Sequence, residues 1–283
     1  MAAVIMAGTA WAGDAVKGPA ISMKLVEPVG FPVENAALAA RVAVNKPLLE
    51  RFDKAGYGAV WQVDRLPQDA TNLATWVKTC LKTFPTPPIL AMDARLENGA
   101  LSPSLEAWDR FLKLALPKAR SVIVNYRGLD NFSCVTNEEA AIAACLQLAR
   151  LVRQHDSKAF RWLMLDDDPT SAERMSRWIA RLQSSVEGYY LYYNHGLAML
   201  GDSRMAQAAG PVLSTGKPVI RGGFTYTAPR VRPGLGKDLR EQYGERMKRY
   251  EAWITAGGYA GYSRLLGNAG TGGESPNLVY LPE

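Results

Sequence analysis

The stretch FRWLMLDDDPTSAERMSRWIARLQSSVEGYYLYY, residues 160–193, decides the fold class of this protein. It holds two short apolar runs, Phe160–Asp166 and Gly188–Tyr193, on either side of a segment with helical periodicity, residues 170–184. A helix between two strands acts as a crossover connection, which pairs the two strands in parallel. The stretch therefore predicts one strand–helix repeat and the strand of the next.

The same alternation continues along the whole chain. The further strand candidates are Met23–Val29, Ala59–Asp64, Ile89–Asp93, Val122–Tyr126, Pro218–Phe224 and Tyr259–Arg264. The further helix candidates are residues 34–55, 69–83, 102–116, 136–155, 203–209 and 237–256. Eight strands separated by helices predict a single (β/α)8 barrel of the TIM type, a fold of roughly 250 residues. An open, doubly wound sheet is the alternative, but no glycine-rich dinucleotide fingerprint follows the first strand.

Residues 14–283 are expected to form one barrel domain, since no linker divides them. The glycine-rich stretch Gly267–Gly273 follows the eighth strand, so the last helix is expected to be reduced or missing. Residues 1–13 end in Ala10-Trp11-Ala12, which resembles a signal-peptide cleavage site, although no Lys or Arg precedes Lys17. The alternatives are a secreted or periplasmic protein with a signal peptide and a disordered N-terminal tail.

The composition excludes several classes of protein. Of the 283 residues, 48% are hydrophobic and 21% charged, which is typical of a folded domain and not of a disordered chain. No apolar run approaches the roughly 18 to 20 residues that span a bilayer. The net charge of +6 favours anionic partners. Lysine and arginine are nevertheless spread over helix faces without a basic arm, so no nucleic acid partner is expected.

Histidine and cysteine are scarce in this sequence. His155 and His195 are the two histidines, which rules out a multi-histidine metal site. Cys80, Cys134 and Cys145 are too few and too scattered for a zinc ribbon, so no metal or cofactor is expected. In an exported protein Cys134 and Cys145 are the nearest pair for a disulfide, and the alternative is three buried thiols.

The functional site of a (β/α)8 barrel lies at the C-terminal ends of its strands. Strand side chains alternate between the lumen and the helices, and the helix-facing side is apolar, so a polar residue at a strand end is expected to face the lumen. The residues predicted to face the lumen are Gln62, Asp64, Asp93, Asn125, Arg127, Trp162, Met164, Asp166, Tyr190, Tyr192, Asn194, Arg221, Tyr262 and Arg264. Glu27, at the end of the first strand, is a further acid.

Carboxylates at this mouth favour glycoside hydrolysis, in which one carboxylic acid protonates the leaving oxygen and a second carboxylate attacks or activates water. Asp93 and Asp166 are the predicted catalytic pair, and Asp64 or Glu27 can substitute for either. Aromatic rings would stack on the sugars, and arginines would bind acidic groups of the glycan. The residues predicted to bind the substrate are Glu27, Trp61, Asn125, Arg127, Trp162, Tyr192, Asn194, His195, Arg221, Tyr262 and Arg264.

Two other function classes stay open. A phosphate-ester or sugar-phosphate enzyme would use the glycine-rich loops after the seventh and eighth strands, with Arg221 and Arg264 clamping the anion. A non-catalytic carbohydrate-binding barrel would have its lumen carboxylates neutralised by arginines. The architecture resembles barrel glycoside hydrolases in general. The glutamates that a large group of them carries after the fourth and seventh strands are absent, so the sequence indicates no particular family.

Overall fold

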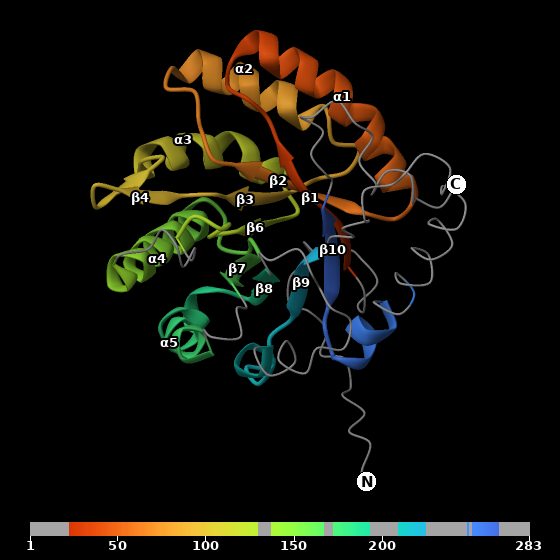
Figure 1. The fold of residues 1–283 in the computed structure, drawn as a ribbon. Helices are drawn as coiled ribbons and strands as arrows, with labels where there is room; N and C mark the ends of the chain where they lie inside the picture. The colour runs from red at the N-terminus through yellow and green to blue at the C-terminus, as the bar shows by residue number, and fades with distance from the viewer. Residues whose placement is uncertain are drawn as a thin grey trace, which may run out of the picture.

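The strands close into an eight-stranded parallel barrel, in the order β1-β10-β9-β8-β7-β6-β3-β2 (Figure 1). The computed structural model of the chain describes residues 23–129, 137–166, 172–192, 209–224, 248 and 251–265. The barrel strands are β1 (Met23–Gly30), β2 (Gly58–Val63), β3 (Ile89–Met92), β6 (Ser121–Ile123), β7 (Arg161–Asp166), β8 (Gly188–Tyr192), β9 (Val219–Phe224) and β10 (Gly261–Leu265). The predicted fold class is confirmed.

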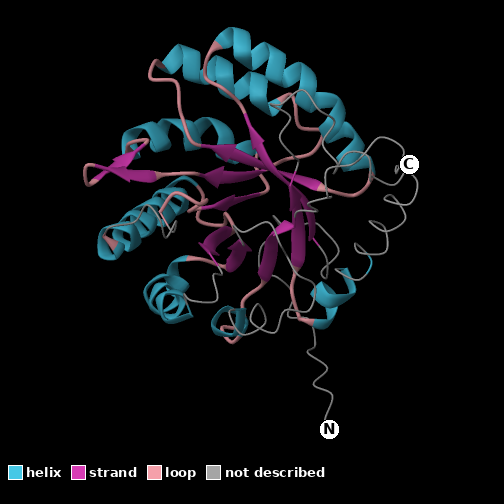
Figure 2. Ribbon diagram, viewed as in Figure 1, coloured by secondary structure: helices cyan, strands magenta, loops and turns pink. Residues whose placement is uncertain are grey.

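Helices surround this barrel, as Figure 2 shows. They are α1 (Asn35–Lys54), α2 (Ala70–Leu81), α3 (Leu105–Ala115), α4 (Glu138–His155) and α5 (Ala172–Leu182), with 3-10 turns at η1 (Leu116–Lys118) and η3 (Gln183–Ser185). Residues 209–213 and 251–256 are also helical. In α5, Met175, Trp178, Ile179 and Leu182 are buried, because the spacing i, i+3, i+4, i+7 places them on one face.

A small hairpin that the sequence analysis did not predict follows β3. Its strands, β4 (Arg95–Glu97) and β5 (Ala100–Ser102), pair antiparallel. The turn is Asn98-Gly99, and both residues have positive φ, 53° and 79°. An Asn-Gly pair is the usual sequence of a two-residue hairpin turn, so this signal was present in the sequence.

The core has two parts, separated by the wall of the barrel. The lumen cluster includes Leu25, Ile89, Met164, Tyr190 and Ile220, and the outer cluster lies between the strands and the helices. In β3, β7 and β8 the side chains alternate between these two clusters as the sequence predicts. Parallel barrels bury both faces of each strand in this way, and the lumen below the mouth is therefore packed.

Several predictions fall on residues outside the described ranges. These are the signal-peptide-like residues 1–13, the reduced last helix, and the site residues Asn194 and His195. Cys134 also lies outside them, so its pairing with the buried Cys145 stays a prediction. In the described part of the chain, no helix combines the length and the apolar character needed to cross a bilayer.

Candidate active site

Polar side chains gather at the C-terminal end of the barrel. Glu27 of β1, Gln62 of β2 and Asp166 of β7 lie on the lumen side of their strands, and Asp93 directly follows β3. Tyr192, the last residue of β8, pairs in register with Asp166. The structure therefore brings together the two predicted catalytic residues and Glu27 at one end of the lumen, where barrel enzymes bind their substrates.

Asp93 is the more deeply buried acid of the predicted catalytic pair. Its side chain is 3% exposed, and its Oδ2 atom accepts a hydrogen bond from Gln62 Nε2 at 2.6 Å. The guanidinium of Arg95 forms a long ion pair with Asp93: its Nη2 atom lies 3.9 Å from Oδ2, and the Arg95 side chain is 61% exposed. Among the described residues, Oδ1 of Asp93 is buried without a hydrogen-bond partner. A buried carboxylate with so little compensation is costly when it is ionised.

Burial raises the pKa of Asp93 to about 6, while the hydrogen bond from Gln62 and the charges of Arg95 and Arg127 act in the opposite direction. The exposed Asp64 carboxylate nearby raises this pKa further. Asp93 therefore keeps its proton over a pH range in which an ordinary aspartate has lost it. This property is required of a general acid.

The raised pKa also predicts a pH-dependent stability. The protonated form is favoured by folding, so its contribution is fully present below pH 4 and is lost as the pH rises through about 6. We expect Asp93→Asn, compared with the wild type, to become more stable by roughly 3 kcal/mol between pH 4 and pH 8. Urea unfolding at both pH values measures this difference. Glu97→Gln, an exposed control in β4, should show little of it, and an equal difference at both pH values for Asp93→Asn would contradict the prediction.

The loop after β6 is fixed by Asn125. The side chain of Asn125 is fully buried, donates to the carbonyl oxygen of Met164 at 3.3 Å and accepts from the backbone N–H of Leu129 at 3.1 Å. The prediction that it binds substrate is therefore wrong, because its polar atoms hold the backbone. Between these anchors lies Gly128, where a Cβ atom would stand 2.8 Å from Asp93 Oδ1. The sequence analysis did not single out this glycine.

Arg127, in the same loop, has a positive φ of 68°, an uncommon conformation for a residue with a side chain. Its guanidinium lies 4.2 Å from the ring centroid of Tyr192 and donates a hydrogen bond to the hydroxyl of that tyrosine. Tyr192 faces the lumen, as predicted, and this contact places Arg127 beside the end of β8. Their binding role stays a prediction.

Glu27 lies in the lumen, fully buried. Its Oε2 atom accepts from the Tyr126 hydroxyl at 2.8 Å, and Ser263 of β10 donates to Oε1. Burial and the nearby Glu27 carboxylate hold the pKa of Tyr126 and of Tyr190 well above the usual range. Ser263 was not predicted, because a serine inside a strand carries no signal of a partner 236 residues away.

Removal of the Tyr126 hydroxyl should destabilise the folded protein, because this hydroxyl donates to the buried carboxylate of Glu27. We expect Tyr126→Phe to lower the free energy of unfolding by about 1–3 kcal/mol, since the buried Glu27 carboxylate loses a donor. Tyr189→Phe is the matched control: the Tyr189 hydroxyl is buried without a hydrogen-bond partner among the described residues. Urea unfolding of both variants tests this, and equal losses would contradict the role given to Tyr126.

The predicted lumen orientations of Arg221, Tyr262 and Arg264, in the seventh and eighth barrel strands, are wrong. Ile220 faces the lumen, so Arg221 points outward, 6.0 Å from the ring centroid of Trp253. Ser263 likewise faces the lumen, which turns Tyr262 and Arg264 outward. The prediction assumed an apolar helix-facing layer. Around β10 this layer is instead polar and aromatic.

Tyr57 and Glu251 make this outer layer polar. Tyr262 donates to Glu251 Oε1 at 2.5 Å, and Lys24 forms an ion pair with the same atom at 2.9 Å. The hydroxyls of Tyr57 and Tyr262 lie 3.0 Å apart, and Arg264 Nη1 donates to the Tyr57 hydroxyl at 3.3 Å. The outward side chains of β10 are thus held by segments that precede β2 and β10.

Two tryptophans are also placed away from the mouth, so their predicted stacking on sugars is wrong. Trp61 points outward, where its ring contacts those of Trp76 and Phe111. Trp162 faces the lumen but lies near the start of β7, where its indole N–H donates to Ser121 Oγ at 3.1 Å. It forms part of the floor of the barrel, remote from the strand ends.

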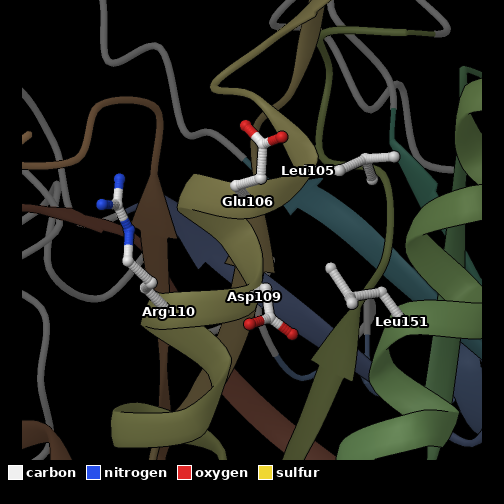
Figure 3. A pocket seen from close by; sticks show the side chains of 5 residues that line it. All are labelled: Leu105, Glu106, Asp109, Arg110 and Leu151. Carbon is white, nitrogen blue, oxygen red and sulfur yellow. The ribbon is translucent and has the colours of Figure 1, made fainter.

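A pocket of about 390 Å³ lies outside the barrel, between α3 and α4 (Figure 3). It is lined by Leu105, Glu106, Asp109, Arg110 and Leu151. His155 Nε2 lies 2.9 Å from Asp109 Oδ1, which gives this histidine a structural role at the end of α4. None of the predicted site residues lines this pocket. Among the described residues no group of three histidine, cysteine, aspartate or glutamate side chains is placed to hold a metal ion.

The chain was compared with known proteins. No protein-family model matches it, and no curated protein matches it significantly. Its fold is similar to that of the β-1,4-D-mannanase from Cryptopygus antarcticus, with 12% identity over 92% of this chain and 88% of that one and a TM-score of 0.54. It is also similar to the xylanase XynB from Paenibacillus barcinonensis, with 9% identity over 86% and 83% of the two chains and a TM-score of 0.52. At these identities the likeness shows the barrel fold alone.

Proposed function

We propose that this protein is a carbohydrate-active barrel that hydrolyses glycosidic bonds, with Asp93 as the general acid and Asp166 as the second carboxylate. The observation that carries the proposal is the state of Asp93. Its carboxyl group is buried at the mouth, one of its oxygens has no hydrogen-bond partner among the described residues, and its pKa is about 6. Such a group can protonate a glycosidic oxygen near neutral pH.

Asp166 is suited to the second role by its different environment. It ends β7 and is half-buried, so water can reach its carboxylate more easily than that of Asp93. One strand, β6, separates β3 from β7, which places the two backbones roughly 10 Å apart. Carboxylates that reach inward from this span can flank one glycosidic bond. Glycosidases need two carboxyl groups whose environments differ in this way.

The solved structures add support for the substrate class. Those with a similar fold include a mannanase and a xylanase, which are named for polysaccharide substrates. Tyr192, an aromatic residue at the end of β8, lies beside the second carboxylate, in register with Asp166. Aromatic faces beside hydrogen-bonding groups suit sugar rings, which have apolar faces and polar edges.

The two alternative functions are less well supported. A phosphate site formed by Arg221 and Arg264 would need both guanidiniums at the mouth, and both point toward the outer layer. A non-catalytic barrel would have its lumen carboxylates neutralised by close ion pairs. For Asp93, the distance of 3.9 Å to an exposed arginine is too long for strong pairing.

Hydrolysis assays test the proposal directly. Purified wild-type protein is incubated with xylan, mannan, glucuronoxylan and polygalacturonate, and new reducing ends are quantified. We expect hydrolysis of at least one polysaccharide, with large losses in Asp93→Asn and Asp166→Asn. Asp109→Asn, a matched substitution in the outer pocket, should retain the activity. Unchanged hydrolysis in both site variants, or none by the wild type, would show that the proposed function is wrong.

A further inference from the structure

Arg127 is held at the mouth in a conformation that the loop imposes. Its φ of 68° is costly for a residue with a side chain and persists where the surrounding structure over-determines it. Asn125 supplies that constraint, because it anchors the loop to Met164 on one side and to Leu129 on the other. Strain of this kind is concentrated at ligand-binding and active sites.

The contact with Tyr192 orients the guanidinium and creates a second donor. Arg127 Nη2 donates to the Tyr192 hydroxyl, and the guanidinium carbon lies 4.2 Å from the tyrosine ring centroid. Because the tyrosine oxygen accepts this bond, its own O–H can donate to another group. A positive charge and a hydroxyl donor are thus fixed beside one another, from the loop after β6 and from the end of β8.

This pair lies among the proposed catalytic residues. Tyr192 is the register partner of Asp166, and the charge of Arg127 is one of those that partly oppose the raised pKa of the buried Asp93. A sugar held by Arg127 and Tyr192 would therefore be adjacent to both carboxylates. The pair lies beside the end of β8, and neither residue lines the pocket between α3 and α4.

We infer that Arg127 and Tyr192 bind the carboxylate of a uronic acid residue, so that the substrate of the site is an acidic glycan. This inference rests on the proposed function and names the substrate class of the same site. A guanidinium presents parallel N–H donors that match the two oxygens of a carboxylate. A neutral sugar would make no use of this charge. Arg221 and Arg264 point outward, so they do not supply this cation at the mouth.

Matched pairs of sugars test this inference. Binding of glucuronate and glucose, and of galacturonate and galactose, is measured by NMR titration. Each pair differs only in the carboxylate. We expect wild-type protein to bind the acidic member at least about 10-fold more tightly, and Arg127→Gln to lose most of this preference. Arg127→Lys should restore only part of it, because lysine lacks the planar fork. Arg150→Gln, which removes an exposed arginine of α4 on the outside of the barrel, should keep the preference.

Hydrolysis distinguishes failure of the inference from failure of the proposed function. Glucuronoxylan and unsubstituted xylan, and polygalacturonate and its methyl ester, are compared as substrates. Equal binding of acidic and neutral sugars, with hydrolysis that depends on Asp93, would overturn the inference and leave the proposed function standing. Selective uronate binding that depends on Arg127, without hydrolysis of any polymer, would overturn the proposed function and support acidic-sugar recognition.

Discussion

Asp93→Asn should lower kcat/KM for the hydrolysed glycan by about 10²–10⁴-fold, the range that general acid catalysis supplies. Asparagine has nearly the same shape and can still accept the hydrogen bond from Gln62, but it cannot transfer a proton to the leaving oxygen. The variant should also be more stable than the wild type at neutral pH, since it removes a buried carboxylate whose pKa is about 6. Loss of activity together with gain of stability identifies a residue retained for function.

The pH profile of the wild type provides a second measurement of the same assignment. A general acid acts in its protonated form, so kcat/KM should fall as the pH rises through about 6. Asp64→Asn removes a negative charge that raises the pKa of Asp93, so this limb should move to lower pH in that variant. Activity that stays constant from pH 5 to pH 8 would contradict the assignment of Asp93 as the acid.

The second large effect is expected at Gly261, where the last strand of the barrel meets the first. A Cβ atom at this position would lie 2.2 Å from the carbonyl oxygen and 2.7 Å from the backbone nitrogen of Met23. These are backbone atoms of β1, which pairs in parallel with β10 over five residues from Met23 to Glu27. No side-chain rotation relieves such an overlap, so the two strands must separate. We expect Gly261→Ala to cost more than about 4 kcal/mol.

Gly30→Ala is the matched control for this variant. Gly30 belongs to β1, the strand that pairs with β10, but it lies past the residues of that pairing, and a Cβ atom there would meet no atom within 4 Å. Its replacement by alanine should therefore change the stability by less than about 1 kcal/mol. Thermal unfolding followed by circular dichroism compares the two variants. If Gly261→Ala fails to fold while Gly30→Ala stays native, the prediction is also met. A Tm for Gly261→Ala within a few degrees of wild type would contradict the clash.

The sequence predicted the strands well because most of them alternate cleanly. In β3, Leu90 and Met92 face the helices, so Asp93 had to face the lumen, and the structure agrees. The same reasoning placed Asp166 and Tyr192 at the mouth. These residues need no knowledge of distant segments, because the period of two within a strand is a local property of the backbone.

The rule that polar strand residues face the lumen failed where the layer between the strands and the helices is itself polar. Arg264 and Tyr262 were expected in the lumen because no polar residue should face the helices. The outer layer at β10 holds Tyr57 and Glu251, which bind both side chains. Whether a layer is polar depends on which helices and loops cover it, and those segments lie far away in the sequence.

The sequence by itself determined the number of the barrel strands and their order along the chain, the barrel, and the placement of Asp93 and Asp166 at the strand ends. It did so because hydrophobic periodicity is a local record of which faces are buried. Only the tertiary structure decided which arginine reaches the mouth, since Arg127 depends on a loop anchored by Asn125. It also decided the partners of Glu27 and the pKa of Asp93. Hydrogen bonds and desolvation depend on groups that only the closed barrel brings into contact.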